Sequence, residues 1–171
     1  PVFLGVSDLL KYSADRTKEL LVAQLNYRLG EVQDALVTAS LERIFIENRI
    51  YKDKPFEEAA CEADALDHVR KRIEAMEDLV FVRPITEADL KRLLEIKMAR
   101  ILRFNIEKHE ERIAQLMRDA RTIEKHLAHS TQYTIDYYTR LLKEFGAGWT
   151  RKTTIARFGT IEATKVIEAT E

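Results

Sequence analysis

Apolar positions recur every seven residues along the stretch from Ile106 to Phe145, which contains neither Gly nor Pro. One set of heptad positions is Ile106, Ile113, Ala120, Leu127, Thr134 and Leu141, and the interleaved set is His109, Leu116, Ile123, Ser130, Tyr137 and Glu144. Spacings of three and four residues place both sets on one helix face, as in a coiled-coil seam. The pattern predicts one continuous helix roughly 60 Å long that needs a partner along its length.

A second helical pattern runs from Asp8 to about Lys52 and supplies that partner. Its seam positions are Leu25, Leu29, Val32, Leu36, Ala39, Ile46 and Ile50. Ser7 is the predicted N-cap, and Pro55 is predicted to stop the helix. Gly30 interrupts the pattern and costs about 1 kcal/mol relative to Ala. We favour a surface Gly that the helix tolerates; the alternative is a close approach of the second helix.

The segment between the two patterns, residues 53–105, is too long for a tight turn. Residues 56–77 predict one or two short helices, with Leu66, Val69 and Ile73 on one face. A short apolar run, residues 79–82, precedes Pro84. Thr86 has the signature of an N-cap, although Asp89 stands where a capping box prefers Glu or Gln.

The helix that begins after Thr86 is predicted to continue through Leu102, and its apolar surface is broad for a short helix. One face can serve the local core, so the remainder indicates a second contact, such as a partner protomer. The candidate dimer-interface residues are Leu79, Phe81, Leu90, Leu93, Leu94, Ile96, Met98 and Ile101.

These elements predict a mainly all-α fold. Residues 7–52 and 106–145 form a long antiparallel two-helix coiled-coil stalk, and residues 53–105 form a small helical globular knob at its tip. Gly146 and Gly148 end the second stalk helix. Residues 149–171 form an extended exit tail, which we expect to pair with a short extended segment at residues 2–6.

Composition narrows the classes of function. Charged residues make up 33% of the chain, but the net charge is only −1, so no overall attraction to nucleic acid or acidic membranes is expected. Cys61 is the single cysteine, which excludes an internal disulfide and favours a reducing, cytoplasmic setting. No signal peptide or membrane-span pattern is visible, so no membrane partner is expected. The chain begins at Pro1 without Met, and we expect it to be a fragment of a longer protein.

No motif indicates catalysis, and we predict no catalytic, cofactor-binding or metal-binding residue. His126 and His129 are spaced to share a ligand, but no third ligand is spaced to join them, so solvated side chains are favoured. A cluster of Tyr133, Tyr137 and Tyr138 near Trp149 predicts aromatic packing, with contact to DNA or a partner as the alternative. Three basic tail residues favour a solvated face, with phosphate contact as the alternative. They are Arg151, Lys152 and Arg157.

Several segments resemble the A subunits of bacterial type IIA topoisomerases, DNA gyrase and topoisomerase IV. Residues 93–102, LLEIKMARIL, resemble the family pattern I-L-D-M-R-L-Q-R-L-T that precedes a long charged helix. Residues 151–155, RKTTI, are similar to the family's R-R-T-E-I, and residues 6–10 and 15–17 resemble its first coiled-coil helix. Residues 41–47 and 160–166 are more similar to topoisomerase IV A subunits of the Bacteroidetes lineage. The motifs do not separate gyrase from topoisomerase IV.

The resemblance implies the coiled-coil stalk and exit-gate knob, where two copies meet on a two-fold axis and release a transported duplex. The family's catalytic Tyr follows an Arg in an upstream domain, and no Arg-Tyr pair occurs here. The fragment alone is therefore expected to be inactive, although the full-length enzyme is an ATP-dependent isomerase. The implied partners are a second copy, DNA and the B subunit, which carries Mg and ATP. The alternatives are a free-standing coiled-coil interaction or dimerisation module and, less favoured, a fragment that binds DNA directly.

Overall fold

The computed structural model describes residues 3, 5–76, 81–150 and 152, and their regular secondary structure is helical, without a strand. This confirms the predicted mainly all-α fold. The chain divides into two units, Pro1–Thr134 and Ile135–Glu171, and each is described by itself. Most of the predicted exit tail, 149–171, and part of the extended segment at residues 2–6 lie outside the described residues, so their pairing stays a prediction.

Helix α1, Val6–Glu47, is the 42-residue first helix that the heptad pattern predicted. Its N-cap is Gly5, so the predicted Ser7 cap is wrong; the Gly5 carbonyl accepts the Leu9 N–H at 2.9 Å. The helix ends before Lys52 because Arg49 adopts the left-handed conformation, with a φ of 50°. A short 3-10 turn, η1, follows at Ile50–Lys52. Pro55 does not stop α1 but lies in the first turn of the next helix, where it needs no N–H partner.

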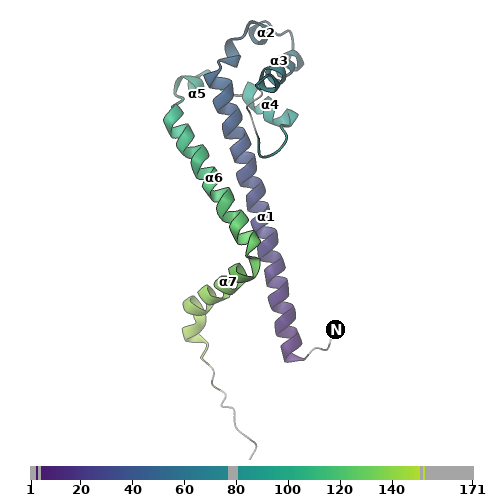
Figure 1. Ribbon diagram of the computed structural model, residues 1–171, viewed down its shortest axis with the longest axis vertical. Helices are drawn as coiled ribbons and strands as arrows, with labels where there is room; N and C mark the ends of the chain where they lie inside the picture. The colour runs from purple at the N-terminus through teal and green to yellow at the C-terminus, as the bar shows by residue number, and fades with distance from the viewer. Residues whose placement is uncertain (1–2, 4, 77–80, 151, 153–171) are drawn as a thin grey trace, which may run out of the picture. The chain divides into compact units, whose positions relative to one another are not determined.

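Helix α6, Ile106–Ala128, packs antiparallel against α1 (Figure 1). Late residues of α1 contact early residues of α6: the His109 Nε2–H donates to the Ala39 carbonyl at 2.8 Å. Early residues of α1 meet the end of α6: the Lys18 Nζ lies 2.8 Å from the Thr131 Oγ1, just beyond the helix. These pairs confirm the antiparallel direction that was predicted for two helical patterns joined by residues 53–105.

The predicted single helix over residues 106–145 is wrong, because it is interrupted at His129. Helix α6 ends at Ala128, and α7 spans Ser130–Phe145. His129 has φ −116° and ψ 44°, outside the helical region. Residues 129–134 read His-Ser-Thr-Gln-Tyr-Thr, a run with mostly weak helix formers. Helix α7 is followed by the 3-10 turn η2, Gly146–Gly148, which agrees with the predicted glycine stop.

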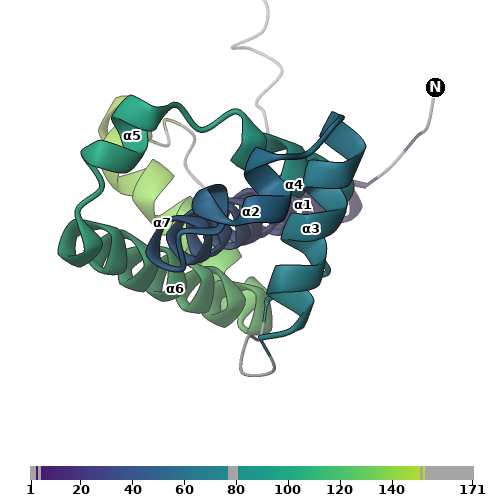
Figure 2. The ribbon, with the colours of Figure 1, turned by 90° about the horizontal axis from the view of Figure 1, so that it is seen from above.

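The knob (residues 53–105) packs on the C-terminal turns of α1. It contains α2, Lys54–Glu57; α3, Glu62–Glu74; α4, Glu87–Leu94; and α5, Met98–Leu102. Figures 1 and 2 place α3 and α4 on one side of α1, and α5 and α6 on the other. The core joins apolar side chains of α1, η1, α3 and α4: Val37, Leu41, Phe45, Ile50, Leu66, Val69, Ile73, Leu90 and Leu93. The predicted inward face of Leu66, Val69 and Ile73 is therefore confirmed.

The predicted helix from Thr86 through Leu102 is also interrupted, and this expectation is corrected. Residues 95–97 separate α4 from α5, and Lys97 is extended with a ψ of 142°. The Ile96 N–H bonds the Leu93 carbonyl at 3.2 Å, so the last turn tightens before the chain leaves the helix. Ile96 and Ile101 then pack against the core from separate elements. Tertiary packing has overridden a helical pattern that contains no Gly or Pro.

Candidate functional site

An ion-paired network fixes the start of α4. Arg83 Nη1 and Nη2 lie 2.7 and 2.9 Å from the two carboxylate oxygens of Asp89. The Asp89 side chain is only 3% exposed, whereas that of Arg83 is 24% exposed. The Arg83 guanidinium, aided by bonds from Thr86, holds the pKa of Asp89 well below its usual range. Asp89 is therefore an ionised carboxylate inside the protein, satisfied by a bidentate partner.

The same carboxylate caps its own helix. Asp89 accepts hydrogen bonds from the Thr86 N–H at 2.9 Å and the Thr86 hydroxyl at 2.7 Å. Thr86 Oγ1 accepts the Asp89 N–H in return at 3.4 Å, which completes a capping box. The shorter Asp side chain thus does here what Glu or Gln more often does.

Arg83 also links the knob to α1. Its Nε lies 2.6 Å from Asp34 Oδ1, so one guanidinium bridges the carboxylates of α1 and α4. On the other side of α1, Arg100 of α5 donates to both carboxylate oxygens of Glu42, at 2.7 and 3.3 Å. The Glu42 hydrogen bond raises the pKa of Arg100. These pairs attach two knob helices to one rigid helix.

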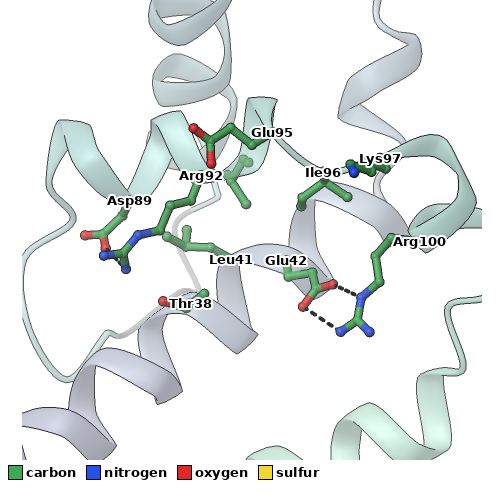
Figure 3. A pocket seen from close by; sticks show the side chains of 10 residues that line it. Thr38, Leu41, Glu42, Asp89, Arg92, Glu95, Ile96, Lys97 and Arg100 are labelled. Atoms are coloured by element: carbon green, nitrogen blue, oxygen red, sulfur yellow. Dashed lines mark hydrogen bonds and ion pairs between the residues drawn. The ribbon is translucent and has the colours of Figure 1, made fainter.

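A cavity of about 350 Å³ lies between α1, α4 and α5 (Figure 3). Leu41, Leu93 and Ile96 give it an apolar lining. Charged side chains also line it, and Figure 3 shows the Glu42–Arg100 pair at one of its sides. A ligand in this cavity would meet apolar side chains such as Leu41 and Ile96, and charged groups that could orient it.

The structure places the predicted interface residues in three different settings. Leu90 and Leu93 are 2% and 3% exposed and belong to the core of this chain, so neither side chain is available to a partner. Phe81, Leu94, Ile96 and Ile101 are half-buried against that core, and Leu79 lies outside the described residues. Among the described candidates, only Met98 has the exposed side chain that an interface residue needs, with 57% of its surface exposed. The dimer interface itself stays a prediction.

Leu102, the last residue of the predicted apolar helix, is an exposed apolar residue that the single interface candidates did not include. It is 80% exposed and stands four residues after Met98 on α5, so the two share a helix face. The i, i+4 spacing was visible in the sequence. The predicted single helix placed Leu90 and Leu93 on one surface with Leu102, whereas the structure buries those two residues in the core.

His126 and the three tyrosines singled out in the sequence take part in ring contacts. The His126 ring lies 4.8 Å from the Tyr133 ring, and Tyr137 contacts Tyr138 edge-on at 5.6 Å. Across the described part of the chain, no group of three or more His, Cys, Asp or Glu is placed to hold a metal ion. Cys61 is an exposed free thiol. No described helix is long and apolar enough to span a bilayer.

Comparison with known proteins gives one informative similarity. No model of a known protein family matches the chain, and no solved structure matches it significantly. Among curated proteins, the chain is similar to the A subunit of DNA topoisomerase 4 from Borreliella burgdorferi, with 26% identity over 158 residues. The match covers 91% of this chain but only 24% of that protein, so the chain spans about a quarter of its relative. This similarity supports a relationship to the A subunits of type IIA topoisomerases.

Proposed function

We propose that the chain is the stalk and exit-gate region of a type IIA topoisomerase A subunit. The observation that carries the proposal is a helical knob on the end of an antiparallel helix pair, in a chain similar over 91% of its length to such a protein. The complete cytoplasmic enzyme would pass one duplex through a break in another, with ATP used by the B subunit. This region would supply a protein gate and no cleavage chemistry.

The proposed gate needs stiff arms and a contact that both holds and releases. Helix α1 supplies a 42-residue rigid element, and Arg83 and Arg100 tie the knob to it. The two protomers must separate at this contact in every reaction cycle. A modest, self-complementary apolar patch allows this, whereas a large core shared by both protomers would not. Met98 and Leu102 on α5 are the exposed apolar side chains that such a patch requires.

Sedimentation velocity on the 171-residue chain tests the gate patch. We expect a concentration-dependent dimer for the wild type and a folded monomer for Met98→Glu/Leu102→Glu, because two charges cannot be buried on the two-fold axis without partners. The matched control is Leu20→Glu/Met117→Glu, which changes two exposed apolar residues of α1 and α6, 56% and 45% exposed, outside residues 53–105. This control should remain dimeric.

A dimer that survives in the α5 variant, or a wild-type chain that is monomeric at all accessible concentrations, would refute the patch. Circular dichroism should show unchanged helicity in both variants. The alternative function is a free-standing coiled-coil interaction module. The genomic reading frame distinguishes the two functions, because the proposed one requires an upstream breakage domain with an Arg-Tyr pair. The Bacteroidetes lineage and the choice between gyrase and topoisomerase IV stay predictions.

A further inference from the structure

A positively charged groove lies at the junction of α5 and α6. Its cavity measures about 220 Å³, and four cationic side chains line it without any acidic one. They are Arg100, Arg103, Lys108 and Arg112. In a chain with net charge −1, this local excess of positive charge is not expected from composition. The net charge that argued against nucleic-acid binding therefore does not describe this surface.

Three of these four cations have no protein partner. Among the described residues, the side chains of Arg103, Lys108 and Arg112 make no hydrogen bond or ion pair, and all three residues are exposed. Other Arg side chains of the knob and stalk are engaged in ion pairs, as Arg43 is with Glu110 at 2.7 Å and Arg83 is with Asp89 at 2.7 Å. Unpaired charges that converge on one groove repel one another, so an anionic ligand would relieve an existing cost.

The walls of the groove are held in place by buried contacts. The Phe104 ring lies 4.7 Å from the His109 ring, and His109 is fixed to α1 through the Ala39 carbonyl. The Asn105 side chain caps α6 by accepting the Lys108 N–H at 2.9 Å. The cationic side chains therefore extend from a preorganised backbone, which lowers the entropic cost of binding a ligand.

The positive surface continues beyond the groove toward α4. Arg112 also lines a neighbouring cavity of about 200 Å³ together with Arg92, whose guanidinium lies 3.8 Å from the Asp89 carboxylate. The two carboxylates in that cavity, Asp34 and Glu42, are already paired with Arg83 and Arg100. An extended polyanion would thus meet several cations in succession, whereas a single small anion would use only a part of this surface.

We infer that the surface formed by Arg92, Arg103, Lys108 and Arg112 binds the phosphodiester backbone of duplex DNA. Guanidinium groups pair phosphate oxygens in a bidentate way, and Lys108 and Arg112 stand one helical turn apart on the same face. Contacts to phosphates carry no sequence information, so binding should be independent of base sequence. The choice of DNA among polyanions rests on the proposed topoisomerase function.

Fluorescence anisotropy with a labelled duplex and the 171-residue chain at low salt tests this site. The test variant is Lys108→Ala/Arg112→Ala, and the matched control is Arg121→Ala/Lys125→Ala, an exposed Arg and Lys one turn apart on the same helix. Both variants change the net charge equally. We expect the plot of log affinity against log salt to lose about 1.8 of its slope in the test variant, at about 0.9 per phosphate contact, while the control keeps its slope.

Equal loss in both variants would show attraction by net charge alone and would overturn the site, as would the absence of binding to the wild type. A polyglutamate competitor that displaces the duplex at matched charge concentration would assign the groove to acidic polypeptides and overturn the DNA proposal. Inorganic phosphate should compete only weakly. Because dimerisation is measured separately through Met98 and Leu102, failure of this site and failure of the gate give different results.

Discussion

Arg83 donates hydrogen bonds to both carboxylate oxygens of Asp89, at 2.7 and 2.9 Å, and its Nε donates to Asp34 Oδ1 at 2.6 Å. Arg83 precedes α4, Asp89 lies in the first turn of that helix, and Asp34 lies on α1. One side chain therefore determines how the first turn of α4 is attached to the stalk helix. The core of the knob includes residues from the end of α1, so this attachment should also stabilise the fold.

Replacing Asp89 by Asn should destabilise the chain by about 2 kcal/mol, because it removes charged hydrogen bonds to Arg83 and leaves a partly buried cation less well paired. Urea unfolding followed by circular dichroism measures the change. Asp67→Asn is the control, since Asp67 pairs with Lys71 on the surface with a side chain that is 58% exposed. It should have little effect. Equal losses in the two variants would contradict a special role for Asp89.

Acid should weaken the fold through the same carboxylate. Arg83 holds the pKa of Asp89 below its unfolded value, so the unfolded chain binds a proton more readily as the pH falls. The stabilisation is complete above the unfolded pKa of about 4 and is lost as the pH falls toward the folded pKa. The free energy of unfolding should decline below about pH 4, less steeply in Asp89→Asn.

Asp53 should add to this acid sensitivity in the same direction. The His68 hydrogen bond lowers the pKa of Asp53, with a further contribution from Arg72. Both partners lie 3.0 Å from Asp53 Oδ2. Combining Asp53→Asn with Asp89→Asn should therefore flatten the acid limb further than either change alone. A limb that stays as steep in the double variant would assign it to other carboxylates.

The two heptad patterns were enough to predict that α1 and α6 pair, because period and spacing are local properties of the sequence, and the segment 53–105 between them predicted the antiparallel direction. The inward face of α3 was predictable for the same reason. The Asp34–Arg83–Asp89 network could not be predicted from the sequence. Asp34 stands 49 residues from Arg83, and no local pattern joins them. The division between α4 and α5 was also missed, and with it the burial of Leu90 and Leu93. Long-range packing decided both features.

Truncating His109 should cost about 2 to 3 kcal/mol. Its Nε2–H donates to the Ala39 carbonyl, which can only accept, and the residue is 6% exposed. His109→Ala removes this interhelical bond and the ring contact with Phe104, and leaves a cavity between α1 and α6. His126→Ala is the control, because that half-buried ring contacts Tyr133 and makes no bond to α1 comparable to that of His109. Thermal unfolding should separate the two variants clearly.

Gly30 is a position where the chain should gain stability. A Cβ added there would meet nothing within 4 Å, and the residue lies inside α1. This supports a glycine that the helix tolerates, with no close approach by another helix among the described residues. Gly30→Ala should raise the free energy of unfolding by about 1 kcal/mol, because Ala loses less backbone entropy in a helix. An unchanged or lower unfolding midpoint in urea would contradict the tolerated glycine.

The interruption at His129 should be visible in hydrogen exchange and removable by substitution. The first bond of α7 that returns to the interruption runs from the Tyr133 N–H to the His129 carbonyl, at 3.0 Å. The N–H groups of Ser130 and Thr131 therefore occupy the first turn of a new helix, where no intrahelical partner is expected. We expect them to exchange faster than those in the middle of α6.

Substituting His129→Ala/Ser130→Ala should slow exchange at residues 130 and 131 and increase helicity, because Ala propagates the helix that His and Ser do not favour. Thr131 is kept so that its hydrogen bond with Lys18 is retained. Thr122→Ala, which improves helix propensity in the middle of α6, is the control and should leave exchange at residues 130 and 131 unchanged. If the double variant exchanges as fast as the wild type, the interruption is imposed by packing and not by local propensity.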